Sequence, residues 1–263
     1  MRVNPDEAMT RARTAASKAL ELDPYLAEAH VSLALVKTFY DWDWEGAEHE
    51  FAQALALTPG NADVHLWYGV YLGLLGWPEP SRTELEKARS LDPLSLMINN
   101  AMGLPSYFTG RYSEAIAWAC KTLELDPNFY FARTGLASAL TENGEYQQAI
   151  AEYQRARKLD NSPEIVAFLA RACALAGDRG QALRLLRGIE TGKNYVSPFD
   201  VALVYTALGD RRRALGLLEK AYATHAEGMV SLKVDPRLAP LRQEPQFQAL
   251  LRRMNFPDRA RGH

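Results

Sequence analysis

A seven-residue string recurs along the first half of the chain. KALELDP at Lys18–Pro24 returns as QALALTP at Gln53–Pro59, KARSLDP at Lys87–Pro93 and KTLELDP at Lys121–Pro127, with closing prolines 35, 34 and 34 residues apart. A repeat of this length is one helical hairpin, which cannot bury its apolar face alone and must stack on its neighbours. The sequence therefore predicts a solenoid whose function depends on the surface that the stack exposes.

A second marker keeps the phase of the repeat. It consists of glycines spaced 34, 34, 33 and 32 residues apart, namely Gly76, Gly110, Gly144, Gly177 and Gly209. We expect each glycine to divide its unit into two helices. A small residue follows five positions later, such as Ala115 or Ala149, and lets the two helices approach closely. The second helices should end at their Asp-Pro or Thr-Pro pairs, because proline disfavours helical geometry in the residue before it.

These positions resemble the tetratricopeptide repeat. The match is clearest over residues 130–161, where the pattern's small and aromatic positions are filled by Ala137, Gly144, Tyr146, Ala149, Tyr153 and Ala156. The resemblance implies an all-α fold, a right-handed superhelical solenoid of about six helical hairpins. We expect residues 1–226 to form the solenoid and residues 227–263 to form a C-terminal extension. In that extension Phe247, Leu250, Leu251 and Met254 make one apolar stripe, which predicts a capping helix between Pro245 and Pro257.

The first unit is incomplete. Asn4, Pro5 and Glu7 form a helix start, but Ala12 and Ala16 place this helix in phase with the second helices of later units. Its first helix is missing. Two explanations remain open: the chain is the tail of a longer protein cut inside a repeat, or this helix is a natural N-terminal cap.

Composition narrows the class of partner and the compartment. The chain is 48% hydrophobic and 24% charged, as in soluble folded proteins, and its net charge of -2 provides no broad basic field for nucleic acid. The N-terminus lacks the apolar core of a signal peptide, and the longest apolar run, Trp67–Trp77, is about half a membrane span. We therefore expect a cytoplasmic protein with no membrane or nucleic-acid partner. Cys120 and Cys173 have no metal-binding spacing and are expected to be buried free thiols.

No motif for catalysis, metal binding or a cofactor stands out. Asp41, Asp43 and Glu45 imitate the opening of a calcium loop, but the twelfth position of that loop is Ala52, which cannot supply the bidentate carboxylate. His30 and His65 occupy equivalent points of successive units, too far apart to share a metal. The sequence predicts no enzyme, no metal site and no cofactor.

The predicted binding site is the concave groove that the resemblance implies. The first-helix positions that point away from the partner helix mix aromatic, amide and small groups in the middle of the chain, and they suit an extended peptide. The candidates are Asn100, Leu104, Tyr107, Phe108, Phe131, Thr134, Ser138 and Arg171. The alternative is that these aromatic side chains only fill gaps between units. Pro105 lies inside this stretch and predicts a kink in the helix.

Trp42 and Trp44, in the DWDW turn, are secondary candidates that either pack on a neighbouring unit or anchor a partner. The segments Phe39–Leu55 and Val234–Pro257 resemble repeat tails of bacterial signalling proteins. The lysine, asparagine and arginine clamp of repeat proteins that bind chaperone tails is absent. We expect a non-catalytic scaffold that binds a protein or peptide. Self-association as a homo-oligomer, an intramolecular regulatory role, and a small-ligand sensor or enzyme using the groove are the alternatives.

Overall fold

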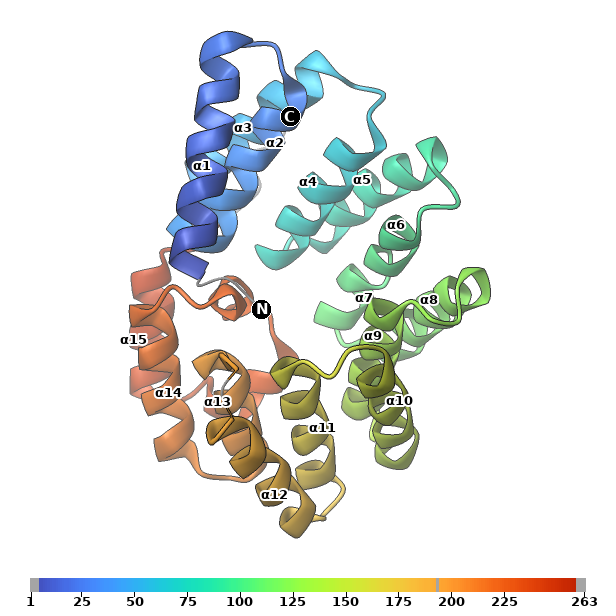
Figure 1. The fold of residues 1–263 in the computed structure, drawn as a ribbon, viewed down its shortest axis with the longest axis vertical. Helices are drawn as coiled ribbons and strands as arrows, with labels where there is room; N and C mark the ends of the chain where they lie inside the picture. The colour runs from blue at the N-terminus through green and yellow to red at the C-terminus, as the bar shows by residue number, and fades with distance from the viewer. Residues whose placement is uncertain (1–4, 193, 259–263) are drawn as a thin grey trace.

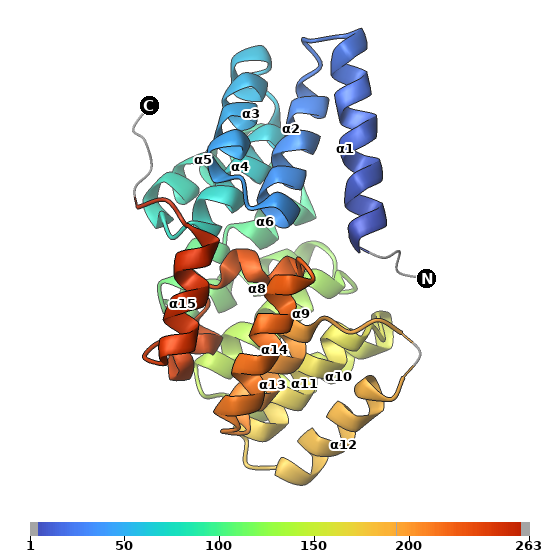
Figure 2. The same cartoon turned by 90° about the vertical axis from the view of Figure 1, so that its left-hand side faces the viewer.

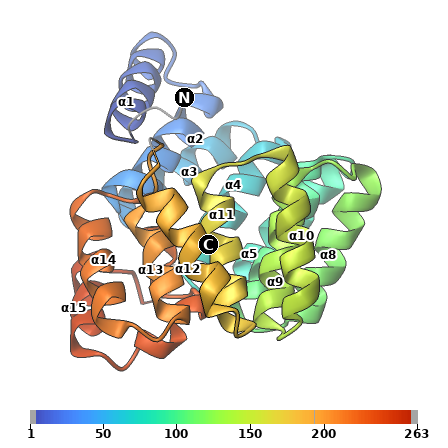
Figure 3. The same ribbon diagram turned by 60° about the horizontal axis from the view of Figure 1, so that its bottom comes forward.

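The computed structural model describes residues 5–192 and 194–258, and within them every regular element is helical (Figure 1). After the single helix α1 (Pro5–Leu22), helices pair as antiparallel hairpins, as Figure 3 shows for α9 and α10. The hairpin helices are α2 (Ala27–Val36) with α3 (Trp44–Leu57), α4 (Ala62–Leu74) with α5 (Pro78–Leu91), α6 (Leu96–Ala101) and α7 (Leu104–Phe108) with α8 (Tyr112–Leu125), α9 (Tyr130–Glu142) with α10 (Tyr146–Leu159), α11 (Pro163–Leu175) with α12 (Arg179–Glu190), and α13 (Pro198–Ala207) with α14 (Arg211–Ala223). This architecture confirms the predicted solenoid.

The predicted turns coincide with the marker glycines. All five adopt left-handed backbone geometry, with φ between 76° and 87°. A residue with a Cβ atom is disfavoured there, and glycine is not. Each glycine lies between a first and a second helix, so the spacing of the glycines sets the length of the repeat.

Pro105 breaks its helix, as predicted. The first helix of the third hairpin is split into α6 and α7, with Met102 and Gly103 between them and Pro105 in the first turn of α7. Proline is tolerated there because the first amides of a helix have no intrahelical partner.

Polar side chains at one repeated position tie three first helices, α2, α4 and α9, to the loop before each of them. Nε2 of His30 and of His65 donates a hydrogen bond to a proline carbonyl, at 3.2 and 2.9 Å, and Nδ1 lies 2.7 and 2.6 Å from a glutamate oxygen of the second helix. Arg133 makes the same two contacts, to Glu152 at 2.8 Å and to the Pro127 carbonyl at 2.6 Å. The histidines at this repeated position therefore have a structural role.

The glutamate paired with His30 is Glu50, and its pKa lies below the usual 4.5. Burial alone raises the pKa of this carboxyl, but hydrogen bonds from Lys37 and His30 outweigh burial. The ionised form of Glu50 therefore stabilises this hairpin.

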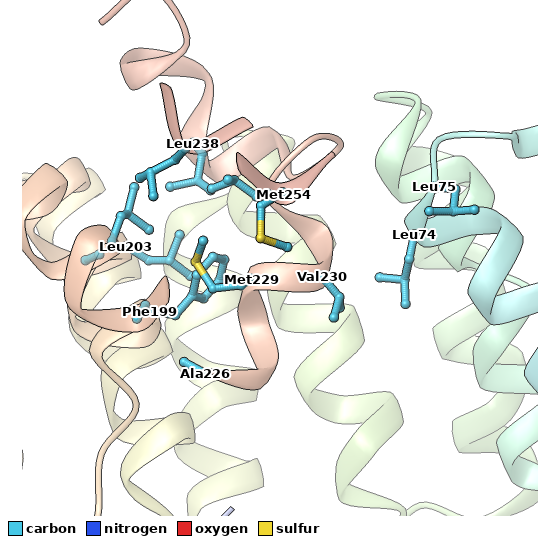
Figure 4. Close-up of a cluster of buried hydrophobic side chains, with 14 of the residues drawn as sticks. Leu74, Leu75, Phe199, Leu203, Ala226, Met229, Val230, Leu238 and Met254 are labelled. Carbon is cyan, nitrogen blue, oxygen red and sulfur yellow. The ribbon is translucent and has the colours of Figure 1, made fainter. Parts of the chain in front are cut away.

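The stack curves until its last hairpin meets its first (Figure 1). One buried apolar cluster contains side chains from α2, α3 and α4 together with side chains from α13, α14 and the C-terminal extension. In Figure 4, Val230 and Met229 of the extension lie between Leu74 of α4 and Phe199 of α13. The apolar core is thus continuous across the closure, which is the contact between the two ends of the solenoid.

The C-terminal extension contains two short turns of 3-10 helix, η2 (Glu227–Ser231) and η3 (Pro236–Leu241), and the helix α15 (Pro245–Met254). Helix α15 lies against α14, and its end reaches the N-terminal hairpin (Figure 2). Phe247, Leu250 and Met254 are buried, and Leu251 is half-buried. The predicted apolar stripe therefore faces the protein.

Of the two free cysteines, one is buried and the other is exposed. Cys173 is buried, and burial raises the pKa of its thiol to about 11, but Cys120 is exposed, so the expectation that both thiols are buried is wrong for Cys120. Successive residues of a helix point in different directions, so Cys120 is exposed on α8 although its neighbour Ala119 is buried. No helix in the described part of the chain is both long and apolar enough to cross a membrane.

Candidate functional site

A cavity of about 410 Å³ opens between the first helices of successive hairpins and the C-terminal extension. Its walls come from α4, α6, α7, α8, α9, α11 and η3. Most of the lining is apolar: Leu66, Trp67, Val70, Met97, Ala101, Gly103, Leu104, Tyr107, Phe108, Ala115, Ala119, Gly135 and Phe168, with Asn100, Ser138, Glu164 and Arg237 as the polar members. Concave, mostly apolar pockets with a few polar groups are typical ligand sites.

The structure brings together five of the eight groove candidates. Asn100, Leu104, Tyr107, Phe108 and Ser138 all line this cavity, although they come from three different helices. The break between α6 and α7 places Leu104, Tyr107 and Phe108 on a separate short helix that faces the same cavity as Asn100.

The other three candidates lie outside the lining. Phe131 is 44% exposed and packs on Tyr130, with ring centroids 4.0 Å apart. Helical spacing places it one turn before Gly135 on the same face of α9. Thr134 donates its hydroxyl hydrogen to the Tyr130 carbonyl at 2.9 Å. Arg171 is buried, and its Nη1 atom lies 2.6 Å from Glu142 Oε1.

Sequence reasoning missed a buried ion pair that the C-terminal extension brings to the cavity. Asp235 is fully buried and accepts hydrogen bonds from Arg237 Nε at 2.9 Å and Nη2 at 2.7 Å. Burial raises the pKa of the Asp235 carboxyl, but the charge and hydrogen bonds of Arg237 outweigh burial and hold that pKa below its usual value. The guanidinium of Arg237 also lies 5.1 Å from the ring centre of Phe168 on α11. The sequence held one clue to Asp235. It precedes a proline, as in the Asp-Pro pairs that end earlier helices of this chain, but here the pair begins a helical turn.

Tyr107 has a buried hydroxyl with no hydrogen-bond partner among the described residues. Burial raises the pKa of this tyrosine well above 10, and the nearby charges are those of Arg237, Asp235, Glu142 and Arg171. A buried polar group without a partner costs about 1–3 kcal/mol, so the native structure holds this hydroxyl at some expense to stability.

Trp42 and Trp44 lie at the closure between the two ends of the solenoid. Trp44 is buried, donates its indole N–H to the Met254 carbonyl at 2.8 Å and stacks on Phe256 at 4.9 Å. Trp42 stacks on His225 with ring centroids 4.6 Å apart. Both side chains therefore pack against the C-terminal part of the chain and not only against a neighbouring unit.

Within residues 5–192 and 194–258, no group of three or more histidine, cysteine, aspartate or glutamate side chains is arranged to hold a metal ion. Asp43 instead caps α3 by accepting a hydrogen bond from the Gly46 amide at 3.0 Å.

Comparison with known proteins agrees with the architecture. Residues 109–172 match the tetratricopeptide repeat family. No curated protein sequence matches the chain. Among solved structures, PilW, described as a widely conserved type IV pilus biogenesis factor, superimposes with a TM-score of 0.61 at 20% identity, over 78% of this chain and 91% of PilW.

Two further structures show the same arrangement. Pseudomonas aeruginosa pilF gives a TM-score of 0.55 at 20% identity, covering 86% of this chain and 97% of pilF. The human IFIT1 dimer with m7Gppp-AAAA gives 0.67 at 17% identity, covering 94% of this chain and 63% of IFIT1. The fold is that of a tetratricopeptide-repeat solenoid. At these identities the likeness concerns the fold alone.

Proposed function

We propose that the chain is a non-catalytic scaffold that binds a peptide or protein segment in the cavity between its first helices. The observation that carries this proposal is the cavity itself, apolar in most of its lining and supplied with amide, hydroxyl and guanidinium groups at intervals. Side chains of a bound segment fill apolar space, and main-chain amides pair with the polar groups. The exposed ring of Phe131, one helical turn from the cavity wall, extends the apolar surface.

A peptide suits this cavity better than a nucleic acid. Arg237 is the one lysine or arginine among the described lining residues, and Asp235 neutralises it at hydrogen-bonding distance. Phosphates need several unpaired cations along a groove, and this lining offers none.

A second role, intramolecular regulation, is favoured by the C-terminal extension, which forms part of the cavity wall through Arg237. We further propose that the chain acts as a regulatory tail of a cytoplasmic bacterial signalling protein. The two segments that resemble such tails contact each other here, through Trp44 and Phe256.

The test is selection of a random twelve-residue peptide library, displayed on phage, against the immobilised full chain. Enriched peptides are then synthesised and titrated by fluorescence polarisation. We expect micromolar binders that lose at least about 1 kcal/mol of binding free energy when Phe131 is replaced by alanine. Tyr25→Ala, at an exposed aromatic residue between α1 and α2 and outside the cavity lining, is the control and should bind normally. Selection without any enriched peptide contradicts the proposed function.

A further inference from the structure

The cavity is large enough for more than one side chain. A cavity of about 150 Å³ in a protein core holds one benzene ring. At about 410 Å³, this cavity accommodates a bulky apolar side chain together with a stretch of main chain. The apolar side chains of α4, α7 and α11 surround that space on several sides.

Gly135 leaves part of this space open. It lies inside α9, where glycine costs about 0.5–1 kcal/mol relative to alanine. At Gly69 and Gly73 of α4, an added Cβ atom would approach Leu85 to 2.8 Å and Ser81 to 3.0 Å, so close packing explains those glycines. At Gly135 an added Cβ atom would meet only Asn100 Oδ1, at an ordinary 3.5 Å. Packing within the chain therefore does not require glycine at this position, and the missing side chain leaves room for the main chain of a ligand to approach.

Two polar residues of the lining, Asn100 and Arg237, carry groups that can form hydrogen bonds with a ligand. Nε and Nη2 of Arg237 bind Asp235, but Nη1 has no acceptor among the described residues. The Asn100 amide lines the same cavity, and its Oδ1 atom lies 3.5 Å from the position that a Cβ atom at Gly135 would take. Because Asp235 already neutralises the guanidinium, Nη1 suits a neutral acceptor such as a main-chain carbonyl better than a carboxylate.

We propose that the cavity binds an extended peptide through one bulky apolar side chain, with the peptide main chain passing over Gly135 and bonded to Asn100 and to Nη1 of Arg237. This inference rests on the proposed peptide-binding function and names the ligand's chemistry. Arg237 is then a specificity-determining residue supplied by the C-terminal extension and not by the repeats. Its orientation is fixed by Asp235 on one edge and Phe168 on one face.

The experiment uses the peptides enriched by the phage selection and the full chain. Gly135→Leu fills the open wall with a good helix former, so we expect binding weakened at least about tenfold with no fall in melting temperature. Gly216→Leu is the matched control, since an added Cβ atom at this α14 glycine meets nothing within 4 Å. Arg237→Lys keeps a positive charge beside Asp235 but lacks the Nη1 group that is proposed to bind the peptide, so this variant should weaken binding several-fold.

The outcomes separate this inference from the proposed function. Enriched peptides that share a bulky apolar position and lose affinity with Gly135→Leu and Arg237→Lys support it. Peptides that bind Gly135→Leu as tightly as the unchanged chain overturn it, while the scaffold function stands at another surface. If Arg237→Lys has a lowered melting temperature, the binding affinities of Gly135→Leu and of its control Gly216→Leu decide whether the inference holds. A selection that enriches nothing overturns both.

Discussion

The closure between the two ends of the solenoid predicts a measurable coupling between Trp44 and Phe256. Their rings stack at 4.9 Å with an interplanar angle of 22°, although they are far apart in sequence. Stacked aromatic pairs contribute about 0.5–1.5 kcal/mol beyond the area that they bury. Trp44→Leu also loses the indole hydrogen bond to the Met254 carbonyl, so this variant alone should lower the free energy of unfolding by about 2–4 kcal/mol.

The assay is a double-mutant cycle. The free energy of unfolding is measured by urea denaturation for Trp44→Leu, Phe256→Leu and the double variant, with m-values compared to confirm the same transition. We expect the double variant to be more stable than the sum of single effects predicts, by about 0.5–1.5 kcal/mol. The control pairs Trp44→Leu with Gln246→Ala, an exposed α15 residue, and should be additive within about 0.5 kcal/mol. A coupling no larger than that of the control would show that the rings do not stack in solution and that the closed arrangement is wrong.

Three further predictions follow from single sites. Tyr107→Phe removes a buried hydroxyl that has no partner among the described residues, so it should leave stability unchanged or raise it by up to about 1–2 kcal/mol. Tyr71→Phe loses a 2.8 Å hydrogen bond to a main-chain carbonyl and should lower the free energy of unfolding by about 1 kcal/mol. Urea denaturation of both variants distinguishes the two effects. Phe247→Ala should lower the free energy of unfolding by about 3–5 kcal/mol and the melting temperature by roughly 6–20 °C in a calorimetric scan, and a shift under 2 °C would contradict burial of α15. The pKa of Glu50 is lowered in the fold, so its stabilising effect is present above its unfolded pKa and is lost as pH falls through the lower folded value. The difference in stability between the unchanged chain and Glu50→Gln, measured by denaturation between pH 7 and 3, should therefore shrink below about pH 4.5 and not above it.

The parts of the fold that local chemistry determines could be predicted from the sequence. Left-handed geometry at Gly76 and its four successors, helix ends at Asp-Pro pairs and the break at Pro105 each depend on a few neighbouring residues. Helical periodicity placed five of the eight groove candidates in the cavity lining, Asn100, Tyr107 and Ser138 among them. Periodicity gave no warning that Arg171 is held by Glu142, because that contact joins two units.

The contribution of the C-terminal extension could not be predicted in the same way. Where Arg237 lies depends on the curvature of the whole stack, which accumulates from a small rotation at each unit. The repeat pattern in the sequence does not give the curvature that accumulates over all the units. The sequence could show that an apolar stripe at Phe247 needs a surface to cover, but not that the same segment would complete the wall of a cavity formed by α4 and α9.

Two residues at the closure between the ends of the solenoid have strained backbone geometry. Trp42 and His225 stack on each other, and both have left-handed backbone geometry, with φ of 56° and 47°. Such geometry costs of order 1 kcal/mol for each residue other than glycine and persists only where surrounding contacts enforce it. Here the enforcing contacts are the stack itself and the 2.6 Å hydrogen bond from the His225 ring to the Tyr40 carbonyl. A closed superhelix cannot lengthen or shorten freely, so the spacing between Asn100, Gly135 and Arg237 is set before a ligand arrives. If the cavity binds a peptide as proposed, a fixed spacing of these three residues would reduce the free energy that binding loses to reorganisation.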